Sequence, residues 1–238
     1  VPPLVSLFFL NFLLEYLLPT NMASIWTILR VEGLVMVFLG GGLCIFEKHL
    51  GRMMGLAAMS EIGFFVLALS LDPSNSSSPA VSIFLSQILP RGIALAVWSL
   101  GLSALLKQRR GLALEQLEGV IQESPVAALS ALLAQFTLAG MPLLAGFPVR
   151  LALWNSLAQD SLPLALLAAA GGAGMVLGAV RALAAMLKQP QARRWQLSES
   201  HMQIFLLLAG WLLILIYGLF PQIFLGAMQR MVSYFALP

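Results

Sequence analysis

Four ionisable side chains lie well inside apolar stretches of this sequence, where a charge is costly. They are two acids followed by two bases: Glu32, Glu61, Arg91 and Arg150. A charge at the centre of a bilayer costs about 2.5–3.5 kcal/mol on insertion scales, so such groups face a bundle interior and pair with one another. Gathered along the midplane of a helix bundle, the four would form a polar chain. The sequence therefore predicts a proton or cation pathway of carboxylates, arginines and water.

The same four residues also allow a purely structural role, as buried ion pairs that fix the register of the helices. Arginine barely deprotonates in proteins. Arg91 and Arg150 are therefore poor proton carriers, and we expect them to act as fixed charges that tune neighbouring carboxylates and water. Both interpretations stay open at the level of the sequence.

Other kinds of chemistry find little support. One cysteine, Cys44, lies in an apolar run, and His49 and His201 lie near the ends of segments. No metal-ligand spacing, nucleophile–base pair or phosphate loop occurs, so we predict no metal, no cofactor and no catalytic residue in this chain. No basic run interleaved with aromatic residues suggests nucleic acid as a partner.

The segment that carries Arg150 should be a broken helix. An apolar run from Pro125 to Ala158 is longer than a membrane helix needs, since about 20 residues span the hydrocarbon. Two glycines and two prolines interrupt it: Gly140, Pro142, Gly146 and Pro148. Proline removes an N–H donor, glycine loosens the backbone, and lipid tolerates freed backbone groups only inside protein or beside a water-filled cavity. The pattern fits an ion pathway, and it fits a plain re-entrant turn equally well.

The composition places the chain in a membrane. Of its 238 residues, 60% are hydrophobic and only 10% are charged, and the mean hydropathy is +0.92. Soluble domains carry about 25% charged residues. We predict an integral multi-pass membrane protein with a single membrane domain over residues 1–238.

Alternating apolar and polar segments predict an all-α, polytopic bundle with discontinuous helices and about seven or eight membrane segments. The expected segments are residues 4–18, 24–46, 53–71, 81–106, 125–139, 147–158, 163–187 and 202–220. Pro90 and Arg91 should interrupt the fourth segment. The polar connection from Lys107 to Glu123 carries apolar residues at helical spacing, so we expect an amphipathic helix lying on the interface there.

Basic residues flank these segments. Counting lysines and arginines near the segment ends gives two groups on opposite faces: Lys48, Arg52, Lys107, Arg109 and Arg110 against Lys188, Arg193 and Arg194. Five against three is too small a bias to orient the chain in the membrane.

Three stretches resemble one family of membrane proteins. Residues 46–64, which end in SEIGF, are similar to a charged turn followed by a YSSIxxxGY helix start. The run LAGMPLLAGF at 138–147 resembles the motif LAGxPPxxGF, and residues 208–225 resemble a last helix with a GLFP ending. On these residues the chain resembles the C-terminal half of the antiporter-like, proton-translocating subunits of respiratory complex I. That family also includes multisubunit cation/proton antiporters and membrane-bound hydrogenases.

The resemblance implies inverted repeats with discontinuous helices at the midplane. The chain opens on Val1-Pro2-Pro3 without a methionine, and we expect an N-terminal part, with the other repeat, to be missing from it. Several family positions differ. Arg150 stands where the family typically carries a proton-exchanging lysine or glutamate, Gly51 replaces a lysine beside Arg52, and Asn11 aligns loosely with a further lysine. A complete relay of neutralisable lysines is therefore absent.

The resemblance implies a membrane-arm subunit of a complex I-like, redox-driven proton pump. The subunit would be non-catalytic, within an NAD(P)H:quinone oxidoreductase-like or hydrogenase-like complex. Its partners would be other membrane subunits and the lipid bilayer, with quinone bound by a neighbouring subunit. The host membrane would be the bacterial cytoplasmic membrane, or a thylakoid or inner mitochondrial membrane. Two alternatives stay open: a subunit of a multisubunit cation/proton antiporter, and a structural subunit whose altered half-channel no longer pumps.

Overall fold

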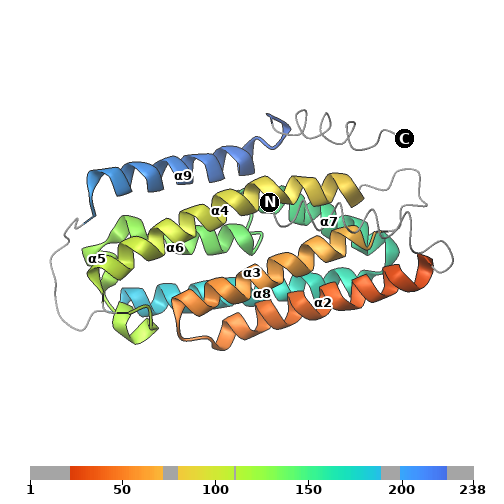
Figure 1. Ribbon diagram of the computed structural model, residues 1–238, viewed down its shortest axis with the longest axis horizontal. Helices are drawn as coiled ribbons and strands as arrows, with labels where there is room; N and C mark the ends of the chain where they lie inside the picture. Colours follow the sequence, from red (N-terminus) through yellow and green to blue (C-terminus); the bar gives the residue numbers. More distant parts are fainter. Residues whose placement is uncertain (1–21, 72–79, 110, 189–198, 224–238) are drawn as a thin grey trace.

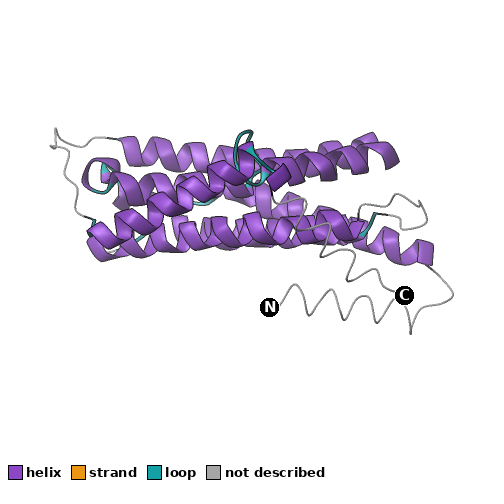
Figure 2. Cartoon of the chain, turned by 90° about the horizontal axis from the view of Figure 1, so that it is seen from above, coloured by secondary structure: helices purple, strands orange, loops and turns teal. Residues whose placement is uncertain are grey.

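The computed structural model describes residues 22–71, 80–109, 111–188 and 199–223, which form a bundle of long helices running side by side (Figures 1 and 2). The elements are α2 (Met22–Phe46), α3 (Leu50–Leu69), α4 (Ala80–Gln108), the 3-10 turn η1 (Leu114–Leu117), α5 (Val120–Glu123), α6 (Pro125–Leu138), α7 (Phe147–Asp160), α8 (Leu162–Leu187) and α9 (His201–Leu219). α2 packs against α3 and α8, and α4 packs against α6 and α9. Over these residues the all-α fold is confirmed.

Helix length and apolarity agree with a membrane bundle. Five described helices are long and apolar enough to cross a bilayer: Trp26–Phe46, Leu50–Leu69, Ser82–Gln108, Leu162–Leu187 and His201–Leu219. α6 and α7 have 14 residues each, about 21 Å of helix, so neither alone spans the hydrocarbon. The expected segment at 4–18 lies outside the described residues, and the other seven each coincide with a helix.

The expected interruption of the fourth segment at Pro90 is wrong, because α4 continues through this residue. Proline cannot donate to the carbonyl of Ser86 four positions earlier. The hydroxyl of Tyr217 on α9 donates to that carbonyl at 3.4 Å. A neighbouring helix thus satisfies the backbone group that the proline frees, as happens in membrane bundles.

The expected amphipathic helix between Lys107 and Glu123 is also wrong, since this connection contains the short η1 and α5. Its backbone pairs instead with the turn between α2 and α3: the N–H of Leu114 donates to Lys48 O and that of Leu50 donates to Leu112 O, both at 2.8 Å. Gly119, with φ +72°, separates the two short elements. The apolar residues of the connection are buried against the bundle: Leu112, Leu114, Leu117, Val120 and Ile121.

Lys188 does not lie on the face opposite Lys48, contrary to the expectation from the sequence. α6 and α7 together cross the bundle once, so α8 returns to the end at which α3 begins (Figure 1). Lys188 lines one cavity together with Lys48, and its Nζ lies 3.6 Å from Glu118 Oε1. Arg110, Arg193 and Arg194 lie outside the described residues. We call this end of the bundle, with Lys48 and Lys188, the basic end.

At the opposite end, an arginine on α2 contacts α3 and α7. Arg30 pairs with Asp160, the last residue of α7, at 2.6 Å and donates to the carbonyl of Ser70 at 3.3 Å. This contact ties the start of α2 to the ends of α3 and α7.

Candidate functional site

The chain leaves α6 at Leu138 and enters α7 at Phe147, in the stretch where the sequence predicts a broken helix. Two residues of the connection have left-handed backbone angles, Gly140 with φ +77° and Leu143 with φ +71°. Short-range bonds satisfy part of the freed backbone: the N–H of Met141 donates to Phe136 O at 3.0 Å and that of Phe147 to Leu144 O at 3.0 Å. The connection is thus an ordered loop between two half-helices.

The two glycines of the connection are needed for different spatial reasons. A Cβ on Gly140 would lie 2.6 Å from Cγ of Arg150, so glycine lets the arginine side chain pass against the backbone. A Cβ on Gly146 would overlap the carbonyl oxygen of Thr137. Pro148 occupies the first turn of α7, where a missing N–H is tolerated, while Pro142 is exposed in the loop. Both helix ends can therefore approach each other around Arg150.

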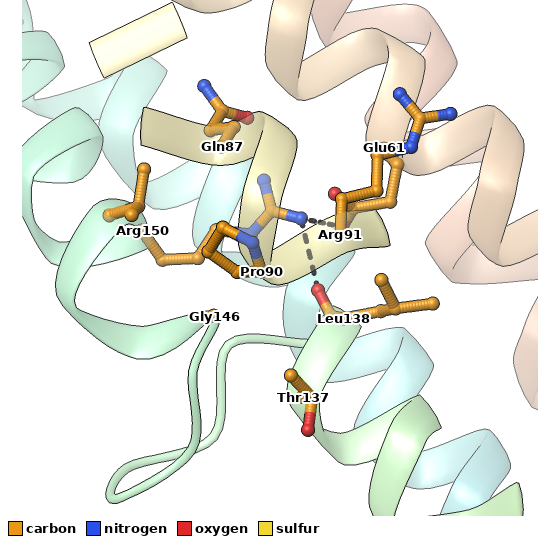
Figure 3. A pocket seen from close by; sticks show the side chains of 9 residues that line it. Glu61, Gln87, Pro90, Arg91, Thr137, Leu138, Gly146 and Arg150 are labelled. Carbon is orange, nitrogen blue, oxygen red and sulfur yellow. Dashed lines mark hydrogen bonds and ion pairs between the residues drawn. The ribbon is translucent and has the colours of Figure 1, made fainter. Parts of the chain in front are cut away.

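Arg150 is buried and makes an ion pair with Glu61 of α3, with side chains only 4% and 5% exposed (Figure 3). Nη2 of Arg150, the atom that contacts Glu61, also donates to the carbonyl of Leu138 at 3.0 Å. That carbonyl is one of the last four of α6, which lack helical partners and carry the negative end of the helix dipole. The guanidinium also lies 3.2 Å from the ring centroid of Phe64, a cation–π contact.

A cavity of about 20 Å³ adjoins this ion pair, enclosed by α3, α4, α6 and α7 (Figure 3). Its lining residues are Glu61, Gln87, Pro90, Arg91, Thr137, Leu138, Gly146, Val149 and Arg150. Among the described residues, Nη1 of Arg150 and the side-chain amide of Gln87 have no hydrogen-bond partner. The volume suits about one water molecule, and polar lining of this kind is what holds such a water.

Three of the four ionisable residues proposed from the sequence line this cavity, and one does not. Glu61, Arg91 and Arg150 come together from α3, α4 and α7. Arg91 is half-buried, with its guanidinium 4.8 Å from the ring centroid of Phe65. Glu32 on α2 is exposed and does not line the cavity.

Sequence reasoning missed several partners of these charges. Gln87 precedes Arg91 by four positions, and Phe64 follows Glu61 by three, so each shares a helix face with the charged residue. These spacings could have identified Gln87 and Phe64 from the sequence. The carbonyl of Leu138 could not have been identified in this way, because it is free to accept only since α6 ends at this residue.

The sequence of this chain is similar to one family of membrane proteins. The family model described as "NADH:quinone oxidoreductase/Mrp antiporter, TM" matches residues 4–178. NADH-quinone oxidoreductase subunit N 2 of Solidesulfovibrio magneticus is 27% identical over 133 residues, 56% of this chain and 28% of the relative. NADH-quinone oxidoreductase subunit N of Dehalococcoides mccartyi is 26% identical over 234 residues, 95% of this chain and 46% of the relative. The chain thus spans less than half the length of these two relatives.

Solved structures show the same arrangement of helices. A chain of the membrane-bound sulfane sulfur reductase, an archaeal respiratory membrane complex, superposes with a TM-score of 0.79 at 20% identity, covering 89% of this chain and 42% of that chain. A chain of respiratory complex I from Thermus thermophilus gives 0.75 at 18% identity, over 95% and 48%. A chain of the Mrp complex from a Dietzia species gives 0.74 at 17% identity, over 85% and 46%.

The sequence motifs, the broken helix and the comparisons agree on one assignment. The chain is an integral membrane protein with an antiporter-like fold, as its resemblance to such subunits predicted. Because the family model matches well over half of its residues, this chain belongs to the NADH:quinone oxidoreductase/Mrp antiporter transmembrane family.

Proposed function

We propose that this chain is a membrane-arm subunit of a complex I-like, redox-driven proton pump and contributes an altered proton half-channel. The relatives named as NADH-quinone oxidoreductase subunits N support the membrane-arm role. It would assemble with other membrane subunits, one of which would bind quinone. A subunit of a cation/proton antiporter would share the fold, and co-purification with flavin, iron–sulfur clusters and quinone reductase activity distinguishes the two.

The observation that carries the altered channel is the ion pair of Glu61 with Arg150 beside a polar cavity. Glu61 is the group here that can take up and release a proton, whereas the arginine stays charged. A proton that arrives on Glu61 removes one charge of the pair and leaves Arg150 held by Leu138 O and the ring of Phe64. Protonation and loss of the ion pair are thereby coupled at the broken helix.

The same contacts favour a second candidate, a structural subunit that does not pump. Both charges are almost fully buried, the cavity has room for about one water, and arginine does not exchange its proton. In this role the pair would only hold α3 against the α6–α7 break.

The ratio of protons moved to electrons transferred separates the two candidates. The host complex, carrying Glu61→Gln, Arg150→Lys or Arg150→Ala, would be purified and reconstituted into liposomes, with Arg30→Gln as a control ion pair outside the cavity. For an altered channel, Glu61→Gln lowers the ratio, Arg150→Lys retains most of it, and Arg30→Gln leaves it unchanged. An unchanged ratio in all three cavity variants, with normal electron transfer, would assign the chain a structural role.

A further inference from the structure

A large basic cavity lies at the basic end of the bundle, far from the broken helix. It has a volume of about 480 Å³ and is formed by the turn between α2 and α3, by η1 and by the end of α8. Four cations and two carboxylates line it: Lys48, Arg52, Arg181, Lys188, Glu115 and Glu118. The balance of charge in this cavity is positive.

Two of the four cations of this cavity have a carboxylate partner among the described residues, and two have none. Lys188 lies 3.6 Å from Glu118, and Arg52, with a side chain 71% exposed, lies 3.2 Å from Glu47. Within the described residues, the side chains of Lys48 and Arg181 make no ion pair. The unmatched positive charge calls for an anionic ligand.

Arg181 indicates how deep that ligand lies. It precedes Leu187, the last residue of α8, by six positions, about 9 Å along the helix. Its neighbours on the outer surface of α8 are apolar, with Leu177 52% and Val180 47% exposed. In a bilayer, an exposed arginine at this depth beside exposed apolar side chains turns its guanidinium up towards the headgroups. The cavity therefore lies at the boundary between the hydrocarbon and the phosphate layer.

A second, apolar cavity adjoins the basic one through Arg52, which lines both. It has a volume of about 620 Å³, and its walls are mostly apolar, with Leu43, Phe46, Gly55 and Leu56. The carboxylate of Glu47, paired with Arg52, also lines it. Phe46 is 75% exposed, and a Cβ on Gly55 would have open space around it. A ligand with an anionic group and an apolar chain would fill the basic cavity and the apolar cavity at once.

We propose that these two cavities together bind one anionic phospholipid. Its phosphate lies among Lys48, Arg52 and Arg181, and an acyl chain follows the groove beside Phe46 and Gly55. Free phosphate offers the same charge but has no tail for the second cavity.

The distribution of charge at the two ends supports this choice. The described cations at the basic end include Lys48, Arg52, Lys107, Arg109 and Lys188, against Arg30 at the other end. The positive-inside rule then places the basic end at the cytoplasmic side, whose leaflet carries anionic lipids.

Lipid binding can be measured by native mass spectrometry on the protein purified with its accompanying subunits, delipidated and titrated with phosphatidylglycerol or phosphatidylcholine. Arg181→Gln and Lys48→Gln should each weaken phosphatidylglycerol binding about fivefold, the effect of one cation at an anionic surface, and leave phosphatidylcholine binding unchanged. Lys107→Gln is the matched control, because Lys107 is exposed at the same end but lines neither cavity. A loss with Arg181→Gln no larger than that with Lys107→Gln would overturn the proposal.

The acyl groove has its own test. Gly55→Leu should fill the groove and reduce phosphatidylglycerol binding, whereas Gly92→Leu on α4, another glycine with open space around it, should not. Inorganic phosphate at millimolar concentration should not displace the lipid. Displacement by phosphate together with no effect of Gly55→Leu would show a plain phosphate site. Photo-cross-linking from position 181 to a neighbouring subunit, with no lipid adduct, would show a subunit interface; either result contradicts a lipid site.

Discussion

Two proline-containing segments meet at the cavity around Arg150. One of them is a continuous helix, and the other is broken. α4 passes through Pro90 without leaving the helix, whereas the chain between Leu138 and Phe147 leaves it completely. In α4, Tyr217 donates to the carbonyl that Pro90 frees. In the break, a glycine with φ +77° turns the chain away from α6.

The difference shows that a proline in a membrane helix does not by itself decide between a continuous and a broken helix. One freed carbonyl can be satisfied by a neighbouring side chain, and the helix then continues. Between α6 and α7 several carbonyls are freed together, and Arg150 takes that of Leu138. The charged side chain is thus part of the break itself, in addition to any role in an ion pathway.

The largest effect should come from separating the ion pair at the break. Arg150→Ala leaves Glu61 buried without its counter-charge, and we expect it to lower the free energy of unfolding by about 3–5 kcal/mol. Unfolding can be followed in mixed micelles by far-ultraviolet circular dichroism. Arg30→Ala is the matched control: its pair with Asp160 is 25% and 30% exposed, and such pairs contribute about 0–1 kcal/mol.

A double variant sharpens this prediction. Glu61→Leu with Arg150→Met replaces the pair by apolar side chains and should recover most of the lost stability, since no charge remains buried. If Arg150→Ala destabilises no more than Arg30→Ala, then the ion pair does not hold the break together.

Only part of this arrangement follows from sequence reasoning, and the limit is physical. The interruption between α6 and α7 is local, because Gly140 turns the chain at φ +77° and Pro142 lies in the loop that follows it. The continuity of α4 is not local, since it depends on Tyr217, 131 positions beyond Ser86.

The same distinction applies to the charged residues of the site. Glu61 and Arg150 are both costly in lipid, and the structure brings them together. Glu32 is equally costly, but apolar residues occupy both the buried and the exposed face of α2. The sequence of α2 therefore does not show which face turns towards the bundle. Charge counting also placed Lys188 on the opposite face. It treated α6 and α7 as two membrane crossings, whereas these two half-helices together make one crossing.

An intermediate loss of stability is expected at the close contact between Gly146 and Thr137, where α7 begins beside α6. Gly146 has helical backbone angles, φ −73° and ψ −24°, so alanine is strained there only by space. Its Cβ would overlap Thr137 O, and we expect Gly146→Ala to cost about 1–3 kcal/mol, as overpacked substitutions do. Gly92→Ala on the continuous α4 meets no atom within 4 Å and should stabilise by about 0.5–1 kcal/mol through helix propensity. Equal effects of the two, measured by the same unfolding titration, would contradict the close approach of α6 and α7.

The smallest effect tests why α4 stays whole. Tyr217→Phe removes the hydroxyl that donates to Ser86 O, and we expect it to cost about 1 kcal/mol, a typical net value for one hydrogen bond. Pro90→Ala restores an N–H that can donate to the same carbonyl, so Tyr217→Phe should cost less in that background. The double-mutant cycle isolates this coupling from the other contacts of the tyrosine ring, which both arms share. Strictly additive costs would mean that Tyr217 does not substitute for the donor that proline removes, and that the continuity of α4 comes from packing against α6 and α9 alone.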